Sequence, residues 1–205
     1  MFFKQVHQNG DNFSYIVADE TTGESAVVDS SYNADDLAQI VKTKNLLLKY
    51  IINTHGHFDH IAGDEELHST FAAAKTVAHS MSKTKPDLPV DDGNIILTGS
   101  LRMKVIHTPG HTPDSICLIV NDSILLTGDT LFVGECGRTD LPGGDPAKMY
   151  DSLFNKLLKL DDAVLVYPGH DYGPRPFSTI GEEKKSNYTL QTRSLAEFID
   201  FMQTG

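Results

Sequence analysis

Three histidines and one aspartate fall within six residues of this chain, in the segment Thr54-His55-Gly56-His57-Phe58-Asp59-His60. The apolar run 48–52 comes directly before the segment, so these side chains follow a strand that we expect to be buried. Histidine and aspartate are the usual nitrogen and oxygen ligands of zinc, iron and manganese. Bringing four such groups to the edge of a core costs desolvation and repulsion unless a cation offsets both. The segment therefore predicts a metal site with ligands for more than one ion, rather than a solvated polar loop.

Length and charge indicate one domain and a small-molecule substrate. The 205 residues, 1–205, fit a single domain, and the balance of 17 basic against 28 acidic residues gives a net charge of −11. That charge argues against binding to nucleic acid or to an anionic membrane. No apolar run approaches the ~20 residues needed to span a bilayer, and the N-terminus lacks the apolar core of a signal peptide. We therefore expect a cytoplasmic protein.

The two cysteines do not form a disulfide framework. Cys117 lies in the apolar segment 116–120 and is predicted to be a core residue. Cys136 lies in a glycine-rich loop and could line a pocket. Because no base lies near it in the sequence, Cys136 is not expected to be a nucleophile.

The pattern of apolar residues predicts layered α/β architecture with stacked sheets. A hairpin is expected from strands 13–18 and 25–28, then a helix from Asn33 to Lys42, a strand at 48–53 and a helix at 64–75. Further strands are expected near 95–97, 103–106, 116–120 and 124–127. Asp145-Pro146 predicts a helix running to about Leu160, which is followed by a strand at 163–167. Helices are also plausible at 178–186 and, after a capping box that begins at Ser194, up to Met202.

Three more segments repeat the order of an apolar strand, a glycine or proline turn, and then a histidine or aspartate. They are Thr108-Pro109-Gly110-His111, Thr127-Gly128-Asp129 and Tyr167-Pro168-Gly169-His170. Loops at strand ends can bring side chains from distant parts of the sequence into one cleft while the sheets hold them rigid. We therefore expect these residues to join the first cluster.

The remaining histidines lack this context. His7, His68 and His79 are interpreted as ordinary surface histidines or as histidines with satisfied hydrogen bonds. His107 follows an expected strand rather than a helix, so we expect it to support a ligand rather than to be one. Asp29, at the end of the apolar run 26–28, could orient a ligand histidine or could simply end a turn, and the two interpretations are equally favoured.

The ligand pattern resembles that of the metallo-β-lactamase superfamily. The family motif His-x-His-x-Asp-His is matched by His55, His57, Asp59 and His60, and the later family ligands by His111, Asp129 and His170. The resemblance covers nearly the whole chain. It implies a single-domain, four-layer αβ/βα sandwich with the metals at one edge of the two sheets.

The resemblance also implies a role for each of these residues. His55, His57 and His111 would hold one divalent ion, Asp59, His60 and His170 a second, and Asp129 would bridge the two. Zinc, iron and manganese all remain open as the metal. Asp59 and Asp129 are predicted to be catalytic as well as metal-binding, because the family's hydrolases use a metal-bound hydroxide.

Within the superfamily the chain is most similar to the glyoxalase II group and to the persulfide dioxygenases. The strings Cys-Gly-Arg-Thr-Asp at 136–140 and His-Asp-Tyr at 170–172 favour the dioxygenases, in which His55, His111 and Asp129 alone would hold a single Fe(II). The string Asp-Leu-Pro-Gly-Gly-Asp at 140–145 favours the short hydrolases labelled glyoxalase II-like. Against a full glyoxalase II stands the chain's end, which lacks the longer helical region that supplies basic glutathione contacts.

The sequence alone slightly favours the hydrolase, partly because hydrolysis is the commonest chemistry of the superfamily. The substrate would be a thioester of a small thiol, such as a hydroxyacylglutathione. The alternative is a mononuclear iron dioxygenase that converts glutathione persulfide to sulfite. A non-catalytic metal-binding or redox module is a more distant alternative, and the aspartate at Asp129 disfavours a β-lactamase.

Two residues near the ligands are candidates for substrate binding. The guanidinium of Arg138 suits an anionic group of the substrate, although an ion pair with Asp140 or Asp145 that braces the loop is at least as well favoured. Tyr172 could donate a hydrogen bond to substrate or could simply pack over its loop. An edge strand or the C-terminal helix could support a homodimer.

Overall fold

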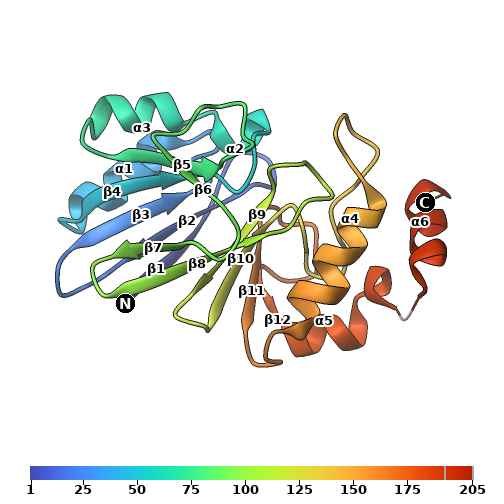
Figure 1. Cartoon of the computed structure of the whole chain (residues 1–205). Coiled ribbons are helices and arrows are strands. Elements are labelled where there is room, and N and C mark those ends of the chain that lie inside the picture. Colours follow the sequence, from blue (N-terminus) through green and yellow to red (C-terminus); the bar gives the residue numbers. More distant parts are fainter. Residues whose placement is uncertain (192, 205) are drawn as a thin grey trace.

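The computed structural model describes residues 1–191 and 193–204 and contains two six-stranded sheets (Figure 1). The first sheet has the order β1 (Phe2–His7), β2 (Phe13–Ala18), β3 (Glu24–Val28), β4 (Leu47–Ile52), β5 (Lys75–His79) and β6 (Leu88–Val90). The second has the order β12 (Ser178–Thr179), β11 (Leu165–Pro168), β10 (Ile124–Gly128), β9 (Ile116–Val120), β8 (Leu101–His107) and β7 (Ile95–Thr98).

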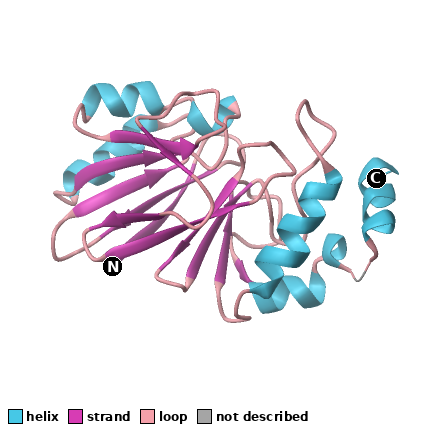
Figure 2. Ribbon diagram, in the orientation of Figure 1, coloured by secondary structure: helices cyan, strands magenta, loops and turns pink. Residues whose placement is uncertain are grey.

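Helices cover the outer faces of both sheets (Figure 2). Those of the first half are α1 (Ala34–Thr43), α2 (Phe58–Ile61) and α3 (Asp64–Thr70). Those of the second half are α4 (Pro146–Tyr150), which continues as a π-helical segment (Asp151–Lys156) and a 3-10 turn (Leu157–Lys159), then α5 (Ile180–Ser186), a second 3-10 turn (Tyr188–Leu190) and α6 (Leu195–Thr204). None of the described helices is long and apolar enough to cross a bilayer.

Three apolar clusters separate the four layers. In β2, Tyr15 and Val17 point into the cluster between the two sheets, whereas Ile16 points to the cluster under α1 and α3. Leu153 and Phe198 belong to the third cluster, between the second sheet and the C-terminal helices. Both faces of each sheet are therefore buried, and the predicted four-layer αβ/βα sandwich is confirmed.

The predicted elements of the first half agree with the structure except at 64–75. β2 and β3 form the expected antiparallel hairpin. Helix α3 ends at Thr70 instead of reaching Lys75, which is the first residue of β5. β1, β5 and β6 were not predicted. β5 and β6 are parallel strands that pair only with partners distant in sequence or across a loop, so no local turn signal marks them.

In the second half the helix that starts at Asp145 has the predicted extent. Asp145 accepts hydrogen bonds from the backbone N–H groups of Ala147 and Lys148, as expected of an N-cap. The capping box at Ser194 is also confirmed, because Ser194 and Glu197 exchange side-chain to backbone hydrogen bonds.

Candidate metal centre

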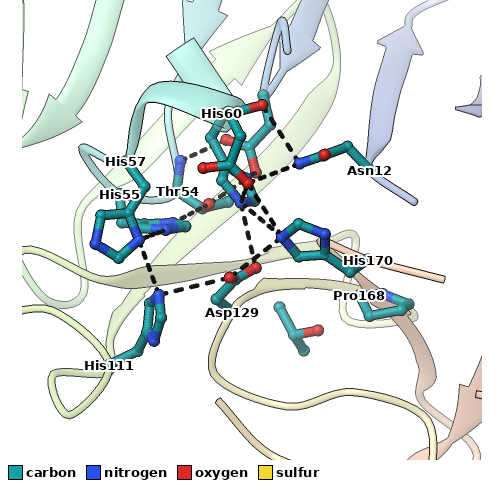
Figure 3. Close-up of polar contacts among 12 residues, drawn as sticks. Asn12, Thr54, His55, His57, His60, His111, Asp129, Pro168 and His170 are labelled. Carbon is teal, nitrogen blue, oxygen red and sulfur yellow. Dashed lines mark hydrogen bonds and ion pairs between the residues drawn. The ribbon is translucent and has the colours of Figure 1, made fainter. Parts of the chain in front are cut away.

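The seven predicted donors lie together where four strands end, and Figure 3 labels all of them except Asp59. β4 leads into His55 and His57 and then into α2, which carries Asp59 and His60, whereas β8, β10 and β11 lead into the other three donors, His111, Asp129 and His170. The donors form three overlapping groups in which all ligand atoms lie within 4.8 Å of one another: His55, His57 and His111; His55, His60 and Asp129; and Asp59, His60 and His170. The strand-end pattern therefore predicted the convergence of all seven.

A glycine allows the ends of β4 and β10 to meet. Gly128 has a φ of +46°, and a Cβ atom there would lie 2.4 Å from Oγ1 of Thr54. Only glycine combines this left-handed backbone with so close an approach. The contact brings Asp129 from the second sheet against the histidines that follow the first.

The donor atoms form two clusters with Asp129 between them. In the first cluster, Nδ1 of His57 lies 3.0 Å from Nε2 of His55 and 3.0 Å from Nε2 of His111. In the second, Nε2 of His60 lies 3.2 Å from Nε2 of His170. Oδ2 of Asp129 lies 3.5 Å from Nε2 of His111 and 3.3 Å from Nε2 of His170. One carboxylate therefore contacts both clusters, as a bridging ligand would.

Hydrogen bonds on the outer side fix which ring nitrogen of each histidine carries a proton. Nδ1 of His111 lies 2.8 Å from the backbone carbonyl oxygen of Arg138, which can only accept, so this nitrogen donates. Nδ1 of His60 lies 3.0 Å from Oδ2 of Asp29, and it donates to that carboxylate. In the neutral imidazoles, Nε2 is then left as a bare lone pair that points into the centre.

His170 and His55 follow the same rule. Nδ1 of His170 lies 3.0 Å from Oδ1 of Asp11. The Oγ1 hydroxyl of Thr54 donates to Oδ2 of Asp29 over 2.7 Å, so the same oxygen accepts from Nδ1 of His55 at 3.2 Å. Asp29 thus supports two of the candidate ligand histidines, directly and through Thr54, and the contact expected of an orienting residue is present.

The arrangement fits a bound cation. The lone pairs of His60 and His170 face each other at 3.2 Å, which is repulsive unless a proton or a metal ion lies between them. Oδ1 of Asp129 is buried and accepts no hydrogen bond, although Nε2 of His60 lies 3.3 Å away in poor alignment. Buried carboxylate oxygens are rarely left without a donor. A nitrogen-rich set with bridging carboxylate oxygen is the donor chemistry of zinc, iron and manganese.

Protons compensate for this charge when no cation is bound. Burial opposes protonation of His60, but the carboxylates of Asp129 and Asp29 outweigh it and raise the pKa of His60 well above its usual value. Burial is likewise outweighed at His170, where hydrogen bonds to Asp129 and Asp59 raise the pKa to about 10. Burial and the neighbouring histidines lower the pKa of His55, which favours the neutral ring that a metal requires.

Three supporting residues were not predicted from the sequence: Asp11, Asn12 and Thr54. Asn12 donates to Oδ2 of Asp59 over 3.0 Å and lies, like Asp11, in the turn between β1 and β2. That turn carries no strand-end histidine, so no sequence signal connects it to the centre. The turn lies beside the centre because Asn12 and His170 form an isolated antiparallel β-bridge, which brings the β1–β2 hairpin against the end of β11.

The histidines outside the centre have separate partners. His79 is buried, accepts from the N–H of Met81 and stacks on His107 with ring centroids 3.9 Å apart. His107 also hydrogen bonds to the carbonyl oxygen of Pro113, over 2.9 Å. The contacts of the His107 ring are thus with Pro113 and His79, not with the donors it was expected to support. Cys117 is a core residue, as predicted.

The two candidate substrate residues lie next to the centre. Nε and Nη2 of Arg138 pair with the carboxylate of Asp140 over 2.7 and 2.6 Å, so the loop-bracing ion pair is present. Tyr172 stacks on His170 with ring centroids 4.8 Å apart and remains half exposed. The packing alternative for Tyr172 is therefore also observed, and a substrate contact of either residue stays a prediction.

Known proteins match this chain in both sequence and structure. The family model described as the metallo-beta-lactamase superfamily matches residues 8–80 and 77–170. Human mitochondrial persulfide dioxygenase ETHE1 is 36% identical over 192 residues, which cover 93% of this chain and 75% of the relative. A probable hydroxyacylglutathione hydrolase of Schizosaccharomyces pombe is 32% identical over 199 residues, which cover 94% of this chain and 74% of the relative.

The fold comparison agrees. The crystal structure of ETHE1 from Myxococcus xanthus superimposes with a TM-score of 0.94 at 35% identity, covering 100% of this chain and 91% of that one. These relatives are enzymes, and the similarity extends through both sheets and the C-terminal helices. The chain is therefore an enzyme that belongs to the metallo-beta-lactamase superfamily.

Proposed function

We propose that this chain is a metal-dependent enzyme acting on the sulfur-containing group, a persulfide or a thioester, of a small thiol-derived substrate. The observation that supports this most strongly is the set of fixed tautomers, which directs the lone pairs of four buried histidines into the two clusters on either side of Asp129. Histidines whose outer nitrogens are already hydrogen bonded need no rearrangement before they bind a cation. When bound, the metal supplies Lewis acidity and an activated oxygen species.

We assign the donors to two positions. His55, His57 and His111 would form one, Asp59, His60 and His170 the other, and Asp129 would bridge them. Asp29, Asp11 and the carbonyl of Arg138 hold the rings in place. Asn12 fixes Oδ2 of Asp59 toward the centre. These contacts keep the donor geometry rigid, so that substrate meets a preorganised site.

Persulfide oxidation is the first of two reactions that fit this proposal. In it, the outer sulfur of a persulfide is oxidised by O₂, water supplies the third oxygen of the sulfite formed, and the thiol and two protons are released. The relatives named as persulfide dioxygenases match this chain along nearly all of its length, and the Cys-Gly-Arg-Thr-Asp string at 136–140 supports the same reaction. His55, His111 and Asp129 would suffice to hold one Fe(II), as in other sites built from two histidines and one carboxylate.

Thioester hydrolysis is the second reaction, and it was slightly favoured by the sequence alone. Here water is added across the thioester of a hydroxyacyl thiol to give a free thiol and a carboxylic acid. Asp59, His60 and His170 would hold the second ion of a dinuclear hydrolase, whereas a dioxygenase would keep these residues without a metal. The identity to both kinds of relative is similar, so we give persulfide oxidation only a slight preference.

Oxygen uptake separates the two reactions. Protein purified without oxygen and loaded with Fe(II) should consume O₂ in proportion to added glutathione persulfide, and Asp129→Ala protein serves as the blank. Zinc-loaded protein should be assayed in parallel for release of free thiol from hydroxyacylglutathione. Activity in neither assay, from protein that binds metal, would contradict the proposed substrate class.

Two further expectations stay predictions. We expect a cytoplasmic enzyme, although the mammalian relatives are named as mitochondrial. A homodimer is also expected only from the availability of an edge strand and of α6.

A further inference from the structure

A pocket of about 300 Å³ opens beside the metal centre, against His57. Its lining comes from four loops: the one after β4, which carries His57, the one after β5 with Met81 and Lys83, the one after β8 with Pro113 and Asp114, and the loop at Pro142. Most of the lining surface is apolar. A molecule whose reacting sulfur lies at the centre would extend into this pocket directly from His57.

The pocket contains one cationic and one anionic side chain that do not pair. Among the described residues, neither the ammonium of Lys83 nor the carboxylate of Asp114 has a hydrogen bond or an ion pair. Asp114 is half-buried, and its Oδ2 would lie only 3.2 Å from a Cβ atom at Gly56. The carboxylate therefore lies over Gly56, next to His57, and the absence of a side chain at Gly56 leaves room for it.

These two charges restrict what can bind. A ligand group that is only anionic would be attracted by Lys83 but repelled by Asp114. A group that is only cationic would be attracted by Asp114 but repelled by Lys83. A group that carries an ammonium and a carboxylate on one carbon satisfies both. Met81, Pro113 and Pro142 offer apolar surface for the methylene groups that lead to it.

We propose that this pocket binds the α-amino acid group of the thiol-derived substrate. Lys83 binds its carboxylate and Asp114 binds its ammonium. The proposal rests on the proposed function, because it assumes that the sulfur lies at the metal centre. It assigns substrate recognition to residues apart from Arg138 and Tyr172, and it makes Lys83 and Asp114 determinants of specificity for either reaction.

Calorimetric titration with a non-reactive ligand tests the pocket without turnover. Metal-loaded protein is titrated with S-methylglutathione, with its N-acetyl derivative, which lacks the ammonium, and with the derivative whose γ-glutamyl α-carboxylate is an amide. The parent ligand should bind about fivefold more tightly than either derivative, the value of one partly exposed ion pair of ~1 kcal/mol.

Each of two substitutions should remove the affinity difference between the parent ligand and one derivative only. Lys83→Gln should weaken the parent ligand about fivefold and leave the amide derivative unaffected, whereas Asp114→Asn should weaken the parent and leave the N-acetyl derivative unaffected. Lys85→Gln is the matched control, since Lys85 is exposed on the same loop but does not line the pocket.

The proposal is overturned if wild-type protein binds the three ligands equally or not at all, or if Lys83→Gln behaves like Lys85→Gln. Because the readout is binding, its outcome is separate from that of the activity assays. If the protein is inactive toward persulfide and thioester but each substitution still affects only its own ligand group, the pocket assignment is supported and the proposed function is contradicted. If the enzyme is active but the substitutions do not have these selective effects, only the pocket assignment is contradicted.

Discussion

Replacing Asp29 by asparagine removes one negative charge while keeping the shape of the side chain, and it should disable the metal centre. Asp29 is only 1% exposed and accepts three hydrogen bonds, from the N–H and Oγ1 of Thr54 and from Nδ1 of His60. Its φ of +53° is well tolerated by asparagine, so the backbone should not be strained. The amide has one accepting oxygen, which cannot serve both positions that the carboxylate serves.

Whichever way the amide turns, at least one donor is left facing an N–H₂ group. If the amide nitrogen faces His60, that ring must move its proton to Nε2 and can no longer offer a lone pair to a cation. Outer partners of metal-binding histidines are worth about 10- to 100-fold in affinity, and we expect a loss in that range. The free energy of unfolding of the metal-free protein should also fall, by about 1–3 kcal/mol for one unsatisfied buried group.

Chelator competition for zinc gives the affinity, and denaturant unfolding of the metal-free protein gives the stability. Asp11→Asn is the control, because the Asp11 side chain is 53% exposed and makes a single hydrogen bond to His170. Its amide oxygen can rotate to accept that bond, so its affinity should stay within about threefold of wild type. Equal affinities for the Asp29 and Asp11 variants would refute the argument that buried outer partners fix the tautomers.

Four other outcomes are expected. Asp129→Ala should abolish metal retention at both positions and all activity, because this carboxylate lies between the two clusters; a fully metallated, active variant would overturn the ligand assignment. Asp59→Asn should reduce metal content from about two ions toward one if the enzyme is a dinuclear hydrolase, and should leave a single iron bound if it is a dioxygenase, as metal analysis would show. Gly169→Ala should lower metal affinity without unfolding the protein, since its Cβ would lie 2.4 Å from Oδ1 of Asp129; unchanged binding, with circular dichroism confirming the fold, would contradict this. The raised pKa values of His60 and His170, about 10 for the latter, mean that this pair of rings holds a proton near neutral pH without metal, so zinc must displace it and the zinc affinity should fall as the pH falls from 8 to 6; proton release measured in weak buffer checks this, and a pH-independent affinity would count against it.

The donors could be predicted from sequence because each one follows a complete local pattern. An apolar strand and a tight turn precede His111, Asp129 and His170, and strand ends in layered α/β folds meet at one edge. The supporting residues have no such pattern. Asp11 and Asn12 reach the centre only because β1 and β2 form a hairpin that packs against the end of β11.

The misplaced elements have a similar cause. The segment 64–75 has helix-forming composition throughout, but the chain leaves the helix after Thr70 because Lys75–His79 pairs with β4 as a parallel strand. Tertiary pairing of this kind overrides local propensity. The pocket beside His57 could not be predicted from the sequence either, since β6, β7 and β8 separate two of the loops that line it.

The donors come from both sheets, and this gives the centre a topological consequence for the whole chain. An ion held by His60 and His170 would join two points 110 residues apart, and in polymer terms it would act as a cross-link. A covalent link that closes a loop of roughly 100 residues removes unfolded-state entropy worth about 4.7 kcal/mol in the simplest chain model. A metal ion differs from a disulfide in that its contribution varies with ion concentration. In this protein, the cohesion between the two halves of the sandwich would therefore depend on the supply of metal around it.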